Sequence, residues 1–159
     1  MTKIEELKKG YSALAKKHSL PSFDKLDEQF EIRSIDLEKG NLINSIIRTI
    51  ASQINNHLDN IYQAINPNQN SFYSMLLYNA LNDKDREKIS MFYQHTIELQ
   101  FQAMLALSGT EQEKIEYINI IYNKYPAIKK ELRQYLNLFI EAWEKIIKQD
   151  SKQKKAGLG

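Results

Sequence analysis

Apolar residues recur every three or four positions along nearly the whole chain, a period that is typical of amphipathic helices. The clearest case runs from about residue 41 to residue 65, where polar side chains such as Arg48, Asn55 and Gln63 fall on the other side. Its apolar positions are Ile43, Ile47, Ile50, Ile54, Leu58, Ile61 and Ile65. Because the alternation that indicates strands is rare, we predict an all-α, single-domain bundle of about five to seven helices.

The N-terminal part of the chain contains two predicted helices. Thr2, followed three residues later by Glu5, forms a capping box that opens a helix running to about His18. After a proline, Ser22 is placed to cap a short second helix that reaches about Phe30.

The stretch that follows, from Glu31 to Leu37, has little helical pattern. We expect an extended connection there that places Ile32 and Ile35 on the bundle.

Two more helices are predicted in the middle of the chain, after a turn over residues 66–70. The first starts near Ser71 and stops at Asn82, and Asp83 is placed to cap the second, which reaches about Ser108. The first helix carries Phe72, Met75, Leu76 and Ala80. The second runs through Ile89, Phe92, Tyr93, Ile97, Gln100, Ala103, Met104 and Leu107.

The C-terminal third is predicted to hold two helices and a tail. Gly109 is placed for a left-handed residue that ends one helix, and Thr110 with Glu113 forms a second capping box for a helix over 111–123. Pro126 suits the first position of a last helix, which ends near Gln149. We therefore expect a helical domain over 1–149 and a flexible basic tail over 150–159.

Composition narrows the classes of function. The 159 residues have a net charge of +2, and the chain has no cysteine, which excludes disulfides, thiolate metal sites and thiol catalysis. The N-terminus has no apolar signal core, and no stretch is apolar enough for a membrane span, so we expect a cytoplasmic protein without a membrane partner.

Few residues are arranged for chemistry. His95 and Glu98 lie three residues apart on one predicted helix, but the Glu-x-x-His pairs of di-iron bundles are absent. Glu141 and Glu144 have the same spacing and fit an exposed face better than an acid–base pair. We therefore predict no catalytic, cofactor-binding or metal-binding residue. An enzyme or metal protein built around His95 and Glu98 is a third, minor alternative.

Aromatic residues are the strongest candidates for an interaction surface. The chain has nine tyrosines, and Phe72, Tyr73, Tyr78 and Tyr93 gather in its middle third. They fit either the rim of the core or a protein-binding patch, because tyrosine suits both settings. We predict that the candidate surface combines these aromatic residues with the stretch from Leu20 to Ile35, whose loose pattern could clasp a partner.

The basic C-terminal end is a candidate for binding nucleic acid. Lys148, Lys152, Lys154 and Lys155 could contact the phosphates of RNA or of a ribosome. A solubilising tail is the alternative, because no known RNA-binding pattern accompanies these lysines.

Two stretches of the chain also have characteristic sequences. The first is Lys-His-Ser-Leu-Pro-Ser-Phe-Asp-Lys-Leu at 17–26 followed by Phe-Glu-Ile at 30–32; the second is Ser-Phe-Tyr-Ser-Met at 71–75 leading to Asn-Asp-Lys-Asp-Arg-Glu-Lys at 82–88. Together they resemble a family of small uncharacterised archaeal all-helical proteins. This resemblance implies an archaeal cytosolic protein with a helical fold, and it brings no activity or catalytic residue. The chain has asparagine, glutamine and isoleucine where that family tends towards glutamate and arginine.

The function predicted from these features is a non-enzymatic helical module that binds another protein or a second copy of itself. An RNA- or ribosome-associated factor that uses the lysine-rich ends is the alternative.

Overall fold

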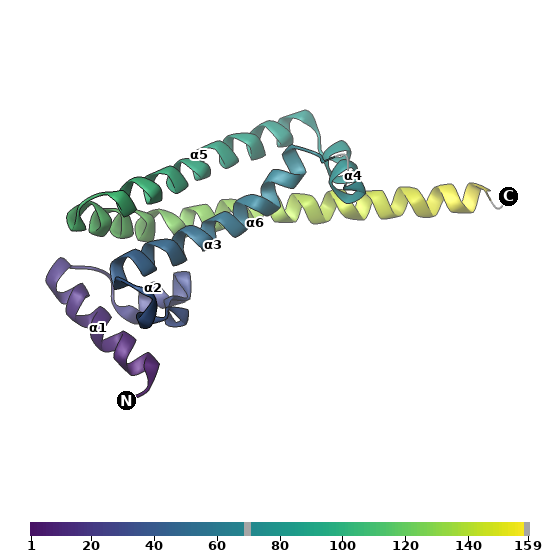
Figure 1. The fold of residues 1–159 in the computed structure, drawn as a ribbon. Coiled ribbons are helices and arrows are strands. Elements are labelled where there is room, and N and C mark those ends of the chain that lie inside the picture. Colours follow the sequence, from purple (N-terminus) through teal and green to yellow (C-terminus); the bar gives the residue numbers. More distant parts are fainter. Residues whose placement is uncertain (69–70, 158–159) are drawn as a thin grey trace. The chain divides into compact units, whose positions relative to one another are not determined.

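A computed structural model of the chain describes residues 1–68 and 71–157, and over these residues Figure 1 shows only helices and their connections. The prediction of an all-α fold is thus confirmed. The elements are α1 (Lys3–His18), α2 (Phe23–Phe30), α3 (Leu42–Ile65), α4 (Phe72–Ala80), α5 (Asp83–Ser108) and α6 (Glu111–Gly157), with two short 3₁₀ turns, η1 (Ile32–Ser34) and η2 (Leu37–Lys39).

The helices form two compact units. Unit 1 consists of Met1–Asn56 with Thr96–Ala127, and unit 2 of His57–His95 with Ile128–Gly159. Three helices, α3, α5 and α6, contribute residues to both units.

The core of unit 1 starts at α1, where the Thr2–Glu5 capping box is present as predicted. Tyr11 is fully buried, donates its hydroxyl to the carbonyl of Pro21 at 2.7 Å and meets the ring of Phe23 edge-on at 5.7 Å. These contacts hold the connection after α1 against α2. Ser22 lies at the N-cap of α2, but its side chain makes no capping hydrogen bond.

Residues 31–37 are extended only at Ile35 and Asp36, which lie between the 3₁₀ turns η1 and η2, so the prediction of an extended connection is wrong for the rest of the segment. Glu31 has a left-handed backbone with φ of 54°, and the chain turns there into η1. Ile32 is buried and Ile35 half-buried, as expected. The compact turn is stabilised by Asp27, a buried polar residue that the apolar pattern does not predict.

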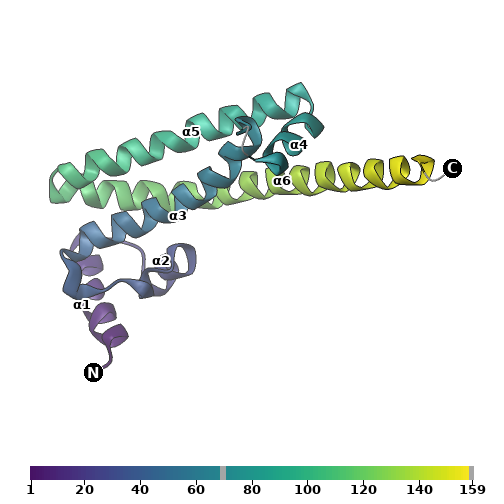
Figure 2. The same ribbon diagram turned by 45° about the vertical axis from the view of Figure 1, so that its right-hand side comes forward.

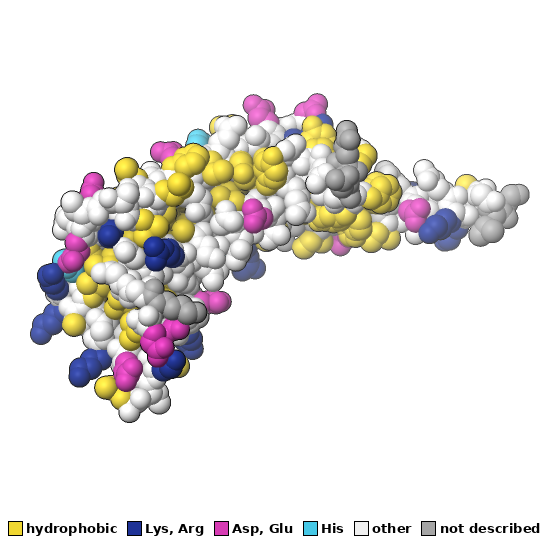
Figure 3. Space-filling model, in the orientation of Figure 1, with side chains coloured by type: hydrophobic (Ala, Val, Ile, Leu, Met, Phe, Trp, Pro, Cys, Tyr) yellow, Lys and Arg dark blue, Asp and Glu magenta, His cyan; other side chains and the backbone are white. Residues whose placement is uncertain are grey.

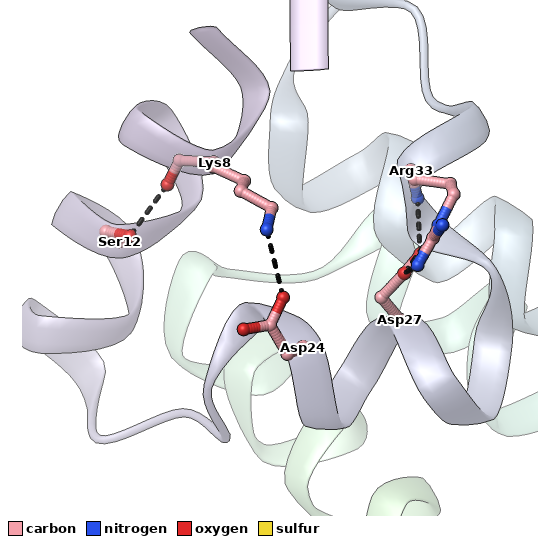
Figure 4. A network of polar contacts seen from close by, with 5 residues as sticks. All are labelled: Lys8, Ser12, Asp24, Asp27 and Arg33. Atoms are coloured by element: carbon pink, nitrogen blue, oxygen red, sulfur yellow. Dashed lines mark hydrogen bonds and ion pairs between the residues drawn. The ribbon is translucent and has the colours of Figure 1, made fainter. Parts of the chain in front are cut away.

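Asp27 is buried and binds the start of η1 through three hydrogen bonds (Figure 4). Its carboxylate accepts from the backbone N–H of Arg33 at 2.8 Å and from Nε at 2.6 Å, and also from Nη2. Burial raises the pKa of Asp27, but the hydrogen bonds and charge of Arg33 outweigh burial and hold this pKa below its usual range. The turn thus depends on an ionised carboxylate.

Replacing Asp27 by asparagine is expected to lower the free energy of unfolding by about 1–2 kcal/mol near neutral pH, because charge-assisted hydrogen bonds are lost. The folded pKa lies below the unfolded value of about 4, so the contribution of Asp27 is present above that pH and is lost as pH falls through the folded pKa. The difference between wild type and Asp27→Asn in denaturant unfolding should therefore shrink in acid. Asp24→Asn, which alters an exposed ion pair with Lys8, is the control and should change little.

Unit 2 has its own apolar core between α3, α4, α5 and α6 (Figure 2). The ring of Phe92 meets that of Tyr135 at 5.2 Å, and the Tyr135 hydroxyl lies 2.9 Å from a carboxylate oxygen of Glu131. The buried members are Ile61, Ala64, Leu77, Leu81, Ile89, Phe92, Leu132, Tyr135, Phe139 and Ala142. In α3, the predicted apolar stripe is buried throughout, except that Ile65 is only partly buried.

The buried face of helix α4 differs from the one that most of its large apolar residues mark. Ser74 and Leu77 are buried, whereas Phe72 and Met75 are exposed and Leu76 is half-buried. Burial of Ser74 is possible because its hydroxyl and its N–H both bond to the Ser71 side chain, at 3.0 and 3.3 Å.

The caps around α5 also differ in detail from the prediction. Asn82, rather than Asp83, caps α5, because its side-chain oxygen accepts from the N–H of Asp85 at 2.8 Å. Among the described glycines only Gly40 has a positive φ, so Gly109 is not the expected left-handed residue. A Cβ on Gly109 would lie 2.3 Å from Glu113 Oε2, so this glycine leaves room for the Thr110–Glu113 capping box, which is present as predicted.

Helix α6 is continuous through Pro126, so the prediction of a helix over 111–123 and a new one from Pro126 is wrong. The chain continues because apolar positions keep their spacing across the proline, at Ile121, Tyr125, Ile128 and Leu132. Residues 150–157, expected as a flexible tail, are exposed last turns of the same helix.

Candidate protein-interaction face

An exposed apolar surface lies in unit 2 where α4 adjoins α6. Tyr73 of α4 packs on Trp143 of α6, with ring centroids 5.1 Å apart. Phe72 is 74% exposed and Ile140 is 57% exposed. We call Phe72, Tyr73, Ile140, Trp143 and Ile147 the aromatic face. Figure 3 shows hydrophobic side chains gathered over α4 and the adjoining part of α6.

The sequence of α6 explains this face, because the helix carries two apolar stripes. One stripe, which includes Leu132, Phe139 and Ala142, is buried in the core of unit 2. The second has the same alternation of four and three and is exposed or half-buried; its positions are Leu136, Ile140, Trp143 and Ile147. A helix needs only one apolar stripe to pack on its own core, so the second stripe is left for another contact.

A groove of about 320 Å³ lies beside this face, between α4 and the C-terminal part of α6. Leu76 and Ala80 line it from α4, and Ile146 lines it from α6. Lys145, Asn79 and Gln149 supply polar groups along the same groove. The groove can therefore receive an apolar side chain with a polar or acidic neighbour.

The four aromatic residues predicted from sequence separate into two kinds. Phe72 and Tyr73 are exposed and belong to the aromatic face. Tyr78 is half-buried beneath the guanidinium of Arg86, 4.4 Å from the ring centroid, and Arg86 Nη1 donates to the Tyr78 carbonyl at 2.8 Å. This pair fastens the end of α4 to α5, so Tyr78 has a structural role.

Tyr93 is also half-buried, and its ring lies 5.4 Å from that of Tyr62. Burial, with the neighbouring Tyr62 and Asp59, raises the pKa of Tyr93. Sequence reasoning missed Trp143, Ile140 and Ile147, although their shared spacing on one helix was visible in the chain.

The segment from Leu20 to Ile35 lies in unit 1. Its apolar side chains form core there, since Leu20, Phe23, Leu26, Phe30 and Ile32 are buried. The structure thus leaves little apolar surface on this segment for a partner.

The histidine and glutamate residues that could take part in chemistry are exposed. His95 and Glu98 are exposed on α5, and Glu141 and Glu144 are exposed on α6. Within residues 1–68 and 71–157, no group of three or more His, Asp or Glu side chains is placed to hold a metal ion. The buried carboxylate of Asp27 is engaged by Arg33.

The lysines proposed for nucleic acid lie on the last turns of α6. Lys148, Lys152 and Lys155 follow Lys145 at spacings of three and four and so share one side of the helix. Lys154 lies outside this row and pairs with Asp150 at 3.0 Å.

Comparison of the chain with family models, curated proteins and solved structures gives no match. Membership in the archaeal family that the sequences of residues 17–32 and 71–88 resemble therefore stays a prediction. None of the described helices has the length and apolar character that crossing a membrane requires.

Proposed function

We propose that this protein is a non-enzymatic helical module that binds another protein through the aromatic face of unit 2. The observation that carries the proposal is the exposed Phe72 beside the Tyr73–Trp143 pair and the apolar stripe of α6. Apolar patches of this kind on a folded surface mark contact sites for other macromolecules.

The types of residue favour a protein as the partner. Tyrosine and tryptophan are the commonest anchors of protein interfaces, and here Tyr73 and Trp143 already brace each other, which lowers the entropy lost on binding. Glu144 lies four residues after Ile140 and three before Ile147, so it places a charge at the rim of the face, whereas Tyr73, Trp143 and Ile140 supply apolar side chains. An apolar centre with a polar rim is typical of protein interfaces.

The shape of the site favours a helix of the partner. An amphipathic helix binds by laying apolar residues three and four positions apart into a groove, and the groove between Leu76 and Ile146 adjoins the aromatic face. Lys145 at this groove would favour an acidic residue beside the apolar ones.

The test is affinity purification of the tagged protein from its native extract, with and without nuclease, followed by identification of the bound proteins. Phe72→Ser combined with Ile140→Ser should lower recovery of specific partners by at least about tenfold, because interface anchors contribute 2 kcal/mol or more each. Met91→Ser, which removes an exposed apolar side chain outside the aromatic face, should retain them.

The outcomes separate the proposals. Partners that survive nuclease and are lost only with the Phe72/Ile140 variant support the aromatic face. Partners retained equally by both variants would contradict it. The circular dichroism spectrum of each variant shows whether the variant is still folded.

A second function, binding of RNA, is favoured by the row of Lys145, Lys148 and Lys152 along one side of α6. A helix presents such a row at regular intervals to a phosphate backbone, and each phosphate contact makes binding weaker in salt. In the same experiment, this function requires partners that are lost with nuclease and with Lys148→Glu plus Lys152→Glu, whereas the aromatic-face variant keeps them.

A further inference from the structure

Helix α5 is apolar on two opposite sides within unit 1. Thr96, Leu99, Ala103 and Ala106 form its buried side. On the other side, Phe101 is 62%, Met104 66% and Leu105 70% exposed. A helix in a water-exposed position has a polar outer side, so an apolar outer side indicates that something covers it.

A groove of about 230 Å³ runs beside this outer side, between α5 and the first part of α6. Leu105 and Ala106 line it from α5, and Tyr117 and Ile120 line it from α6. Exposed Leu105 and the adjoining Phe101 therefore form a ridge next to a groove of matching apolar character.

The charges around this groove are ordered along α6. Glu113 and Glu116 lie at the end near the start of the helix, and Lys124 lies at the other end. Glu113 is occupied by its capping box, whereas Glu116 is exposed and accepts only from Gln112 at 3.1 Å. In the described residues, no ion pair joins Lys124 to an acidic side chain.

Glu116 and Lys124 are spaced symmetrically about Ile120, four residues on either side and each about 6 Å away along the helix axis. A two-fold axis through Ile120 would run a second α6 antiparallel to the first. Lys124 of each copy would then lie opposite Glu116 of the other, and each α6 would lie along the groove of the other copy, against the ridge that Phe101 and Leu105 form at its edge.

We infer that the ridge and groove formed by Phe101, Leu105 and Ile120 bind a second copy of this chain, in a two-fold dimer closed by reciprocal Lys124–Glu116 ion pairs. The charge order selects this occupant, because a surface that pairs with itself must carry opposite charges at equal distances from its axis. The surface lies wholly in unit 1 and does not depend on the aromatic face.

The test measures the dimer dissociation constant of the full chain by sedimentation equilibrium. Lys124→Glu and Glu116→Lys, each alone, place like charges opposite one another twice per dimer and should weaken dimerisation by about a hundredfold or more. An equimolar mixture of the two variants has both pairs restored, so it should form heterodimers nearly as tight as the wild type. Lys130→Glu, the same charge change at an exposed position of unit 2, should leave dimerisation unchanged.

Three results would overturn the inference: a wild-type chain that stays monomeric at about 1 mM, variants that stay monomeric when mixed, or a Lys130→Glu control that dissociates equally. Lys124, Glu116 and Lys130 are all exposed, so these variants should keep their circular dichroism spectra. Leu105→Glu, in the ridge itself, gives an independent readout and should also yield monomers.

Discussion

Replacing Pro126 with alanine is expected to raise the free energy of unfolding by about 2 kcal/mol. Pro126 lies inside α6 and has no N–H to donate to the carbonyl of Tyr122. Alanine is about 3 kcal/mol more favourable than proline in a helix interior. Against this gain stands the rigidity that proline gives the unfolded chain, about 0.4–1 kcal/mol.

Chemical denaturation followed by circular dichroism checks this prediction. Asn123→Ala, an exposed change one turn earlier in the same helix, is the control and should alter stability by only a few tenths of a kcal/mol. A loss of stability in Pro126→Ala would instead mean that the proline starts a separate helix, as the sequence alone predicts.

Truncation of Phe30 to alanine is expected to be the most damaging single change, with a loss of about 3–5 kcal/mol. Phe30 is fully buried at the end of α2, and its ring lies 4.5 Å from that of Tyr125. The substitution leaves a cavity in unit 1 and removes an aromatic pair.

The loss is measured by urea unfolding at a protein concentration low enough to keep the oligomeric state constant. Phe72→Ala is the matched control, since the same chemical change at an exposed position should stay within about 0.5 kcal/mol of wild type. If both variants lose similar stability, the placement of Phe30 in the core is contradicted.

The helices were largely predictable because their apolar spacing is long and regular, and α3 is the best example. At Pro126 a local signal for a helix start conflicts with a longer-range apolar spacing, and the longer-range spacing prevails. Proline is a strong marker of helix starts, but Ile121, Tyr125, Ile128 and Leu132 keep one spacing across it. A break between helices would have shifted that spacing.

The faces of α4 and α5 were harder to predict for a different reason. Both helices carry apolar residues on more than one side, so periodicity alone does not say which side is buried. In α5, Ala103 is buried, whereas its apolar neighbour Met104 is exposed. In α4, the buried side contains Ser74, whose hydroxyl is hydrogen-bonded to the Ser71 hydroxyl. A hydrogen bond of this kind allows a polar side chain to be buried, and hydrophobic patterns do not show it.

The candidate surfaces were therefore predictable only in part. Exposed Phe72 and Tyr73 were identified from their type, but their partner Trp143 lies some 70 residues along the chain, and no local pattern links them. The contact between Asp27 and Arg33 was also not predictable, because it depends on the turn into η1, which has no sequence signal.

The sharing of three helices between two units has a consequence for dissecting the molecule. Each unit is built from two separate stretches of chain, so no single cut yields a fragment containing all of one unit and none of the other. Cuts after residues 56, 95 or 127 would also sever α3, α5 or α6 in mid-helix. Versions of this protein cut at these boundaries would thus expose core residues, and its surfaces have to be studied on a chain that keeps both units.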